Sequence, residues 1–316
     1  MQEILSKIRI LVNKSVQRHS SDSIALSGGL DSSILASCTE NKTMNAFTMI
    51  AKDFVSTDLV NAQLVAKIKD LQLDIISANV DDLLSAAEET IKILKVFNPI
   101  EIRNNIVVYL TMNSAKRSGC DSIMTGDGAD ELFAGYNFFK KMSQTELEKD
   151  LERIWRVMHF PSKSIADAIG ISLHAPFLDP IVSEYAKNMP SGLKVRDEKG
   201  KRYGKWILRK AFENDLPESI IWRDKFAMQD GSGTSGLTSF IDNLIPDILF
   251  LQKSQYYAEN ENVRLASKES LYYYELYRKY FSIPSTLYDS DTKCPNCNYA
   301  LSAGSHFCRM CGSYPI

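Results

Sequence analysis

Residues 27–33 of the chain read Ser27-Gly28-Gly29-Leu30-Asp31-Ser32-Ser33 and follow the apolar run Ile24-Ala25-Leu26. An apolar run, a glycine-rich turn and a second apolar stretch at 34–36 predict a buried strand that leads through a tight loop into a helix. Adjacent glycines leave backbone N–H groups accessible, and free N–H groups at a helix N-terminus attract phosphate. Asp31 would repel phosphate unless a cation lay between them, so the loop also predicts Mg²⁺. An ordinary turn, in which Ser and Asp cap the helix, is the alternative.

Strands and helices alternate between residues 3 and 125. Strands are predicted at 23–26, 44–50, 73–76 and 122–125, and helices at 3–18, 31–39, 57–71, 80–94 and 102–117. This alternation predicts an α/β fold with a parallel sheet and helices on both faces. Parallel strands end at one edge of their sheet, so Ser27 and Gly126, which follow the first and fourth strands, are expected at the same edge.

The second half of the chain has a mostly helical pattern. We expect an α/β part at about 1–142 and a helical lobe at about 143–288, with a short helix at 162–170. The segment 231–236 is rich in glycine and serine, which predicts a flexible lid or linker. The aromatic residues within 272–281 recur at helical spacing and predict core packing.

The composition is that of a globular protein. The 316 residues are 44% hydrophobic and 24% charged, with a formal net charge of −2, which gives no basis for non-specific binding to nucleic acid or membranes. No apolar run is long enough to span a membrane, and the N-terminus carries charges throughout, unlike a signal peptide. A cytoplasmic location is the resulting expectation. Cys38 and Cys120 lie in apolar surroundings and are expected to be buried without forming disulfides.

A second motif follows the fourth predicted strand, where residues 125–136 read Thr125-Gly126-Asp127-Gly128-Ala129-Asp130-Glu131-Leu132-Phe133-Ala134-Gly135-Tyr136. Three carboxylates beside two glycines are costly to hold together without a cation. The start of an ordinary helix, stabilised by acidic residues, is the alternative. At the same sheet edge as the first motif, this acidic segment predicts the other wall of an Mg-ATP site.

The two motifs resemble those of the synthetase domain of asparagine synthetase, in which the first motif is an ATP-pyrophosphatase loop. Further segments match in order and extend the resemblance over about residues 20–240: Thr57-Asp58 with Ala62 and Val65-Ala66, Ile102-Arg103, Ala175-Pro176-Phe177-Leu178-Asp179, Lys205 to Arg209, Leu216-Pro217 and Arg223-Asp224-Lys225. The resemblance implies a Rossmann-like fold. It also implies an enzyme that cleaves ATP between the α and β phosphates, adenylates a carboxylate, with aspartate as the expected substrate, and transfers ammonia to it.

The resemblance also implies roles for individual residues. ATP would be bound by Leu26, Ser27, Gly28, Gly29, Asp31, Ser32, Ser33, Met49, Thr125 and Gly126. Asp31 and Asp130 would coordinate Mg²⁺. Lys225 would stabilise the charge that develops as the carboxylate attacks the α-phosphorus, and Asp127 would govern the adenylate intermediate and the capture of the amine. Arg103 and His174 would lie on the substrate side.

Departures from the family pattern bear on the substrates. The family's glutamine-hydrolysing domain begins with a cysteine directly after the initiator Met, but Gln2 stands there and only residues 1–22 precede the first strand. We therefore expect that domain to be absent, so that nitrogen comes from free ammonia, a separate glutaminase or another nucleophile. Asp127 replaces the family's glutamate and His174 its arginine. An enzyme that adenylates another carboxylate or a tRNA base is thus an alternative, a non-enzymatic nucleotide-binding regulator is a third, and His174 is equally well explained as a structural residue.

The last four cysteines form two Cys-x-x-Cys pairs, Cys294 with Cys297 and Cys308 with Cys311. Their spacing predicts a structural Zn²⁺ ribbon over residues 289–316, a segment so short that it needs the metal to fold. A redox-active dithiol is the alternative, and His306 is a competing candidate ligand. The tail carries few cations, so docking to a protein or to another domain is at least as well supported as binding to RNA.

Overall fold

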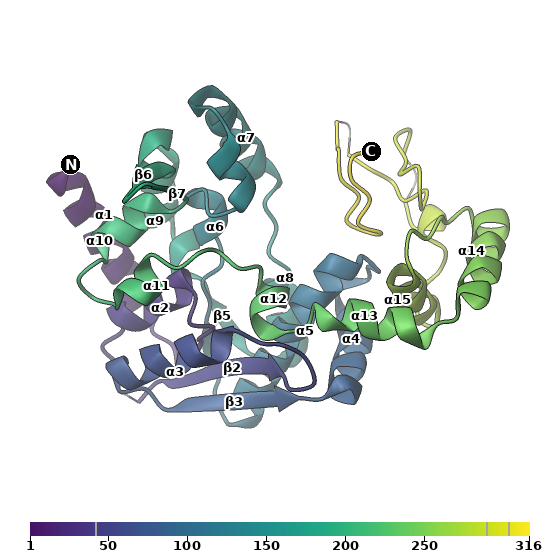
Figure 1. Ribbon diagram of the computed structural model, residues 1–316, viewed down its shortest axis with the longest axis horizontal. Coiled ribbons are helices and arrows are strands. Elements are labelled where there is room, and N and C mark those ends of the chain that lie inside the picture. Colours follow the sequence, from purple (N-terminus) through teal and green to yellow (C-terminus); the bar gives the residue numbers. More distant parts are fainter. Residues whose placement is uncertain (42, 289, 303) are drawn as a thin grey trace. The chain divides into compact units, whose positions relative to one another are not determined.

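The computed structural model describes residues 1–41, 43–288, 290–302 and 304–316 (Figure 1). Its main sheet has five strands in the order β3-β2-β1-β4-β5. The strands are β1 Ser23–Ala25, β2 Asn45–Ala51, β3 Leu73–Ala78, β4 Ser122–Met124 and β5 Ser172–His174. β1 pairs in parallel with β2 and β4, and β4 pairs in parallel with β5. The predicted α/β fold is confirmed.

The strand order places the two sequence motifs side by side. β2 and β3 lie on one side of β1 within the sheet, and β4 and β5 lie on its other side. Ile24 of β1 lies opposite Met124 of β4, so the loops that follow these strands leave from neighbouring positions. Open parallel sheets bind ligands in the crevice where the strand order reverses.

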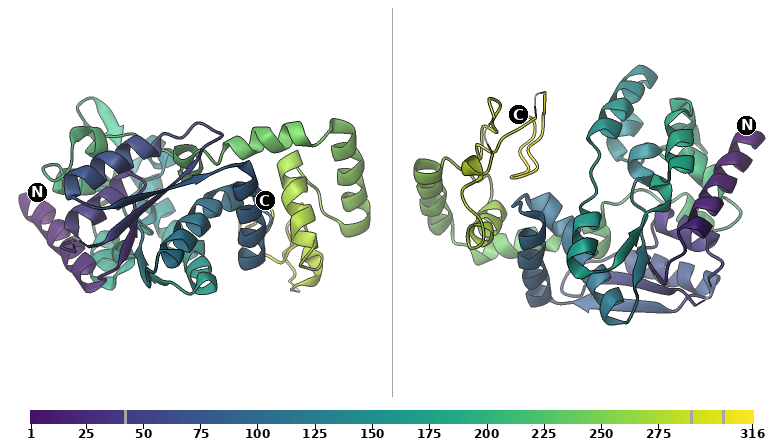
Figure 2. Two further views of the ribbon diagram at one scale, coloured as in Figure 1. Left: turned by 90° about the horizontal axis from the view of Figure 1, so that it is seen from below. Right: turned by 180° about the vertical axis from the view of Figure 1, so that it is seen from behind.

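The chain divides into two compact units, and the first comprises residues 1–49, 57–76 and 111–227. Helix α2 packs against both α1 and α3 in this unit (Figure 2). Its helices are α1 Gln2–Arg18, α2 Leu30–Cys38, α3 Asp58–Lys69, α6 Ala129–Leu132, α7 Gln144–Val157, α8 Pro161–Ile169, α9 Pro180–Lys187, α10 Trp206–Ala211 and α11 Glu218–Ile221. Short 3₁₀ helices lie at Asn137–Lys141, Pro176–Leu178 and Ser191–Leu193, and β6 Arg196–Glu198 pairs antiparallel with β7 Lys201–Tyr203.

The second unit comprises residues 50–56, 77–110 and 228–316. Its helices are α4 Val80–Leu94, α12 Met228–Ser232, α13 Gly236–Leu244, α14 Asp247–Glu261 and α15 Lys268–Arg278, with a 3₁₀ helix at Pro284–Thr286. Helix α5, Pro99–Arg117, has residues in both units. Tyr273, Tyr274 and Tyr277 of α15 are fully buried, which confirms the predicted core packing for these three residues, whereas Tyr280 is 45% exposed.

Three local expectations are corrected. β5 was not predicted, and it adds a fifth strand in a region expected to be helical. Helix α5 begins at Pro99 rather than at residue 102, because a proline in the first turn sacrifices no helical hydrogen bond. The segment 231–236 is not an exposed lid or linker, since Gly231, Ser232, Gly233 and Thr234 are all buried.

The predicted burial of Cys38 and Cys120 is confirmed, and both are free thiols. None of the helices in the described part of the chain has the length and apolar character needed to cross a membrane.

A buried lysine in the first unit makes stability depend on pH. Lys194 is 1% exposed, its Nζ lies 4.4 Å from the centre of the Trp155 ring, and burial lowers its pKa to about 7. An unfolded lysine has a pKa near 10.4, so between pH 7 and 10 the unfolded chain binds a proton that the folded chain does not. The free energy of unfolding therefore rises with pH through this range, and the cost of the buried charge is complete below pH 7.

We expect Lys194→Met to stabilise the protein by roughly 3 kcal/mol more at pH 6.5 than at pH 9.5, because the folded protein buries a charged lysine at pH 6.5 and a neutral one at pH 9.5. Urea unfolding at both pH values measures this difference. Lys187→Met, at an exposed position of α9, is the control and should change stability by less than about 0.5 kcal/mol at either pH. The same effect of Lys194→Met at pH 6.5 and at pH 9.5 would contradict the prediction.

Candidate active site

The loop after β1 is organised by close packing and by its own hydroxyl groups. Gly28 has a φ of +70°, and a Cβ atom there would lie 2.3 Å from the backbone nitrogen of Ala62. The Ser27 hydroxyl accepts a hydrogen bond from the Gly29 N–H at 3.2 Å and lies 3.2 Å from the Ser32 hydroxyl. Gly29 is the N-cap of α2. The loop thus presents a helix N-terminus together with the neighbouring hydroxyls of Ser27 and Ser32, an arrangement suited to phosphate.

Two polar atoms of this loop have no partner among the described residues. The Asp31 Oδ1 atom and the Ser33 hydroxyl are both buried and form no hydrogen bond. Buried polar groups in proteins are nearly always paired, so such orphaned atoms mark a place for a bound group. Phosphate oxygens would pair with a hydroxyl, and a cation with a carboxylate oxygen.

The loop after β4 lies directly against the first one. A Cβ atom on Gly126 would lie 2.9 Å from the Cβ atom of Asp31, so the glycine allows the two motifs to touch. Asp127 accepts hydrogen bonds at its Oδ2 atom from the Thr125 hydroxyl at 3.0 Å and from the Ser162 hydroxyl at 2.5 Å. Burial raises the pKa of Asp127, although the two hydroxyl donors oppose this effect. The shared sheet edge predicted for the two motifs is confirmed.

Four charged side chains join the two loops. The Lys205 Nζ atom lies 2.5 Å from Asp31 Oδ2 and 2.6 Å from Asp130 Oδ1, and the Lys225 Nζ atom lies 2.9 Å from Asp130 Oδ2. Lys205 is only 2% exposed, whereas the side chain of Lys225 is 28% exposed. Lys225 is therefore the ammonium of the pair that a ligand can reach.

The charged side chains of this cluster shift one another's pKa values. Burial alone would raise the pKa of Asp130, but Lys205 and Lys225 outweigh it and hold that pKa below its usual range. Burial would likewise lower the pKa of Lys225, but Asp130 and Asp31 outweigh it and raise that pKa. The cluster therefore keeps Asp130 and its reachable ammonium ionised at neutral pH.

Glycines make room for the buried lysine. A Cβ atom on Gly135 would lie 1.9 Å from Asp130 Oδ1 and 2.1 Å from the Cε atom of Lys205, and one on Gly204 would lie 2.2 Å from the carbonyl oxygen of Ala134. Lys205 itself has a φ of +54°. The second motif thus contributes not only carboxylates but also the space that the Lys205 side chain occupies.

Some residues of the site were not singled out from the sequence. Lys205, Arg223 and Asp58 lay within the segments that carry the resemblance, but no role was assigned to them. Arg223 donates to Asp58 Oδ1 at 2.8 Å and to the Gly28 carbonyl oxygen at 3.3 Å, so it braces the first loop. Ser162 had no sequence signal beyond its place near the start of a predicted helix, since the residue that it contacts is 35 positions away.

The remaining predicted residues lie in varied surroundings. Leu26 and Met49 are buried at neighbouring strands, at 0% and 3% exposure. The His174 Nδ1 atom lies 2.9 Å from the carbonyl oxygen of His19, a contact that the structural interpretation of this histidine accommodates. Arg103, in the second unit, donates to Gln229 at 2.8 Å and forms a close ion pair with buried Glu269. The roles of these residues toward ligands remain predictions.

The four tail cysteines converge in the second unit. Their sulfur atoms all lie within 4.8 Å of one another, with Cys294 Sγ 3.6 Å from Cys311 Sγ and Cys297 Sγ 3.7 Å from Cys308 Sγ. These separations are too long for disulfide bonds. Four thiolates at about 2.3 Å from a tetrahedral Zn²⁺ would be roughly 3.8 Å apart, so the cluster fits that ion.

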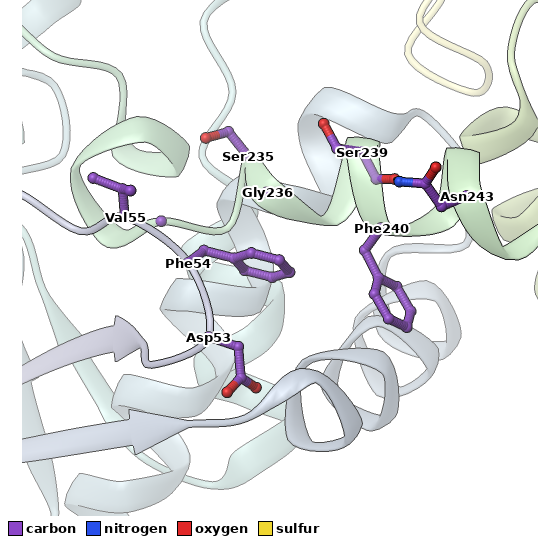
Figure 3. Close-up of a pocket in the computed structure, with 9 residues that line it drawn as sticks. Asp53, Phe54, Val55, Ser235, Gly236, Ser239, Phe240 and Asn243 are labelled. Carbon is purple, nitrogen blue, oxygen red and sulfur yellow. The ribbon is translucent and has the colours of Figure 1, made fainter.

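A hollow of about 560 Å³ lies elsewhere in the second unit. Figure 3 shows the Phe54 ring pointing across it toward α13, which carries Phe240. Its lining comprises Asp53, Phe54, Val55, Gly233, Ser235, Gly236, Ser239, Phe240 and Asn243, none of which was a predicted site residue. A Cβ atom on Gly236 would lie 2.3 Å from the Phe54 ring. Because glycine has no Cβ atom, the Phe54 side chain can pack against the start of α13.

Comparison with known proteins decides the family. A family model described as asparagine synthase matches residues 7–163 and 143–285. The chain belongs to the asparagine synthase family. It is 30% identical over 305 residues to "Asparagine synthetase [glutamine-hydrolyzing]" of Gallus gallus, covering 89% of this chain and 53% of that protein. It is 27% identical over 283 residues to "Asparagine synthetase [glutamine-hydrolyzing] 3" of Arabidopsis thaliana, covering 82% and 48%. The chain thus spans about half the length of the curated relatives that it matches.

Proposed function

We propose that this member of the asparagine synthase family is an ATP-dependent carbon–nitrogen ligase that converts aspartate, ATP and ammonia into asparagine, AMP and pyrophosphate. The observation that carries the proposal is the cluster of Asp31, Lys205, Asp130 and Lys225, which lies at the junction of a phosphate-type loop and an acidic loop. A phosphate-binding site alone would not require a reachable ammonium beside two carboxylates. The relatives are named as glutamine-hydrolysing asparagine synthetases, which supports asparagine as the product.

In the first step, an oxygen of the aspartate side-chain carboxylate attacks the α-phosphorus of ATP. A bond forms between them, the bond from that phosphorus to the bridging oxygen breaks, and pyrophosphate leaves. The N–H and hydroxyl groups of 27–33 hold the pyrophosphate, and Lys225 offsets the negative charge that develops at the α-phosphate. Asp31 and Asp130 would hold Mg²⁺, which supplies further positive charge to the phosphates, and the unpaired Asp31 Oδ1 fits that role.

In the second step, ammonia attacks the carbonyl carbon of the mixed anhydride. The bond between that carbon and the oxygen of AMP breaks, and one proton leaves the attacking nitrogen. Asp127 accepts this proton in our proposal, and burial makes its carboxylate a stronger base by raising its pKa. Ser162 acts through Asp127, because its hydroxyl fixes the orientation of that carboxylate.

We expect Ser162→Ala to move the acidic limb of the pH–rate profile for asparagine synthesis to higher pH. Loss of the hydroxyl donor raises the pKa of Asp127 further, so the base is protonated over a wider range of pH. Activity relative to the wild type should fall more at the acidic end of the profile than at its alkaline end. Ser162→Thr keeps the hydroxyl and should retain the wild-type profile, and an equal loss at both ends would refute this role.

The products test the proposed function. With ATP, Mg²⁺, aspartate and ammonium, we expect equal amounts of AMP, pyrophosphate and asparagine. ADP as the product would refute cleavage at the α-phosphorus. Pyrophosphate release that requires another carboxylate or a tRNA instead of aspartate would support the alternative substrates left open by Asp127 and His174.

We also propose that Cys294, Cys297, Cys308 and Cys311 bind one structural Zn²⁺. The four-sulfur donor set and its separations support zinc, and the count is complete without His306. Elemental analysis of the purified protein should find about one zinc per chain. Its absence, even after incubation of the reduced protein with zinc, would refute this part of the proposal.

A further inference from the structure

The second cysteine pair contacts the start of helix α5. The Phe97 N–H donates a hydrogen bond at 2.9 Å to the carbonyl oxygen of Met310, which lies between Cys308 and Cys311. Gly312 has a φ of +84°, and a Cβ atom there would lie 2.6 Å from Asn98 Oδ1. That same oxygen accepts from the Ile100 N–H at 3.1 Å at the start of α5. A metal-ligating loop thus packs on the residues that begin this helix.

The first cysteine pair contacts the turn between α14 and α15. The Arg264 N–H donates at 2.6 Å to the carbonyl oxygen of Asn296, which lies between Cys294 and Cys297. The Asn298 side chain donates at 2.8 Å to the carbonyl oxygen of Asn262. Val263, between the two bonded residues of the turn, is fully buried.

The two metal-ligating loops are also joined to each other, because the Asn296 side-chain amide donates at 2.8 Å to the Ser313 hydroxyl. The segments that they contact meet in the same core. The Phe97 ring lies 4.8 Å from that of Tyr274 and 5.5 Å from that of Tyr277, both on α15. The ribbon therefore contacts both Phe97, which packs on α15, and the turn that leads into α15.

We propose that the zinc ribbon is an internal clamp that fastens the start of α5 to the turn between α14 and α15. This inference rests on zinc binding by the four cysteines but not on the ligase reaction. With the metal bound, the four thiolates would fix the two metal-ligating loops relative to each other. The segments that donate hydrogen bonds to these loops, at Phe97 and Arg264, would then be held relative to each other as well. The carbonyl oxygens of Asn296 and Met310, one in each metal-ligating loop, accept hydrogen bonds from this same chain, as a clamp requires.

The amides of Phe97 and Arg264 report on the clamp directly, since both donate to carbonyl oxygens of the ribbon. We measure their hydrogen exchange, and the zinc content, in the full chain before and after treatment with a zinc chelator under reducing conditions. We expect both amides to exchange at least about tenfold faster after metal loss. The Ile245 amide of the second unit, which donates to Ile241, should change less than about twofold.

A matched pair of glycine variants separates docking from metal binding. Gly312→Ala adds a methyl group against Asn98, whereas Gly304→Ala meets no atom within 4 Å at a similar φ of +73°. We expect Gly312→Ala to keep its zinc and to exchange at Phe97 at least about fivefold faster than Gly304→Ala. Cys311→Ser, which removes a ligand, should accelerate exchange at both reporter amides.

The outcomes distinguish the two proposals. Failure to bind zinc would overturn both the metal assignment and the clamp. Bound zinc whose removal changes exchange at Phe97 and Arg264 by less than twofold would overturn the clamp alone, and so would identical exchange in the two glycine variants. Asparagine synthesis does not enter these measurements, so the ligase proposal stands or falls separately.

Discussion

Lys225→Ala should lower the rate of aspartate-dependent exchange between ATP and pyrophosphate by at least about a hundredfold. The Lys225 ammonium is the reachable positive charge of the cluster, and its loss removes stabilisation of the charge that develops at the α-phosphate. Folding should survive, because Asp130 keeps its buried ion pair with Lys205. The exchange assay reports on adenylation alone, so it is independent of the nitrogen donor.

Two further variants control this experiment. Lys225→Arg keeps the charge but changes its position, so we expect an intermediate loss of exchange. Lys199→Ala removes an exposed lysine that pairs with Glu218 and should leave the rate within about twofold of the wild type. Wild-type exchange in Lys225→Ala, in a protein with unchanged thermal stability, would contradict the role assigned to Lys225.

Gly28→Ala should destabilise the protein by about 3 kcal/mol and abolish binding of ATP. The left-handed backbone costs an alanine about 1 kcal/mol, and a methyl group would collide with the backbone of Asn61 and Ala62. Relief of that collision moves the loop away from α3, which displaces the phosphate-binding N–H groups. Urea unfolding and calorimetric titration with ATP measure the two effects.

Gly170→Ala is the matched control for Gly28. Gly170 also has a left-handed φ, of +76°, but a Cβ atom there meets nothing within 4 Å. We expect it to cost only about 1 kcal/mol and to leave the affinity for ATP unchanged. Equal destabilisation by the two variants would show that close packing of the loop on α3 contributes nothing.

The local sequence was sufficient to predict those parts of the structure that are formed by residues close together in the chain. The apolar run before Ser27, the glycines after it and the helix that follows lie within one continuous segment, so the strand-loop-helix unit was predicted. β5 was missed because it has only three residues, and none of them is among the β-branched and aromatic types that are enriched in strands. Its place in the sheet comes from pairing with β4, which no local pattern reveals.

The other features that were not predicted from the sequence depend on contacts between residues far apart in the chain. Lys205 is 174 positions from Asp31, and only the fold places its ammonium between two carboxylates. The segment 231–236 has the composition of a linker, but its residues 231–234 are buried, and the Thr234 hydroxyl donates at 3.0 Å to the carbonyl oxygen of Arg103. Its glycines provide close packing rather than flexibility: a Cβ atom on Gly233 would lie 3.0 Å from the Val55 carbonyl oxygen.

Our central claim is that the side-chain carboxylate of aspartate is adenylated. Transfer of an oxygen atom from aspartate to AMP tests this claim most directly. If the side-chain carboxylate attacks the α-phosphorus, and ammonia then breaks the bond between its carbon and the transferred oxygen, that oxygen remains on AMP. Aspartate labelled with ¹⁸O in the side-chain carboxylate should therefore yield AMP with one ¹⁸O atom for each asparagine formed, as measured by mass spectrometry. Unlabelled AMP formed alongside labelled asparagine would contradict adenylation of the carboxylate.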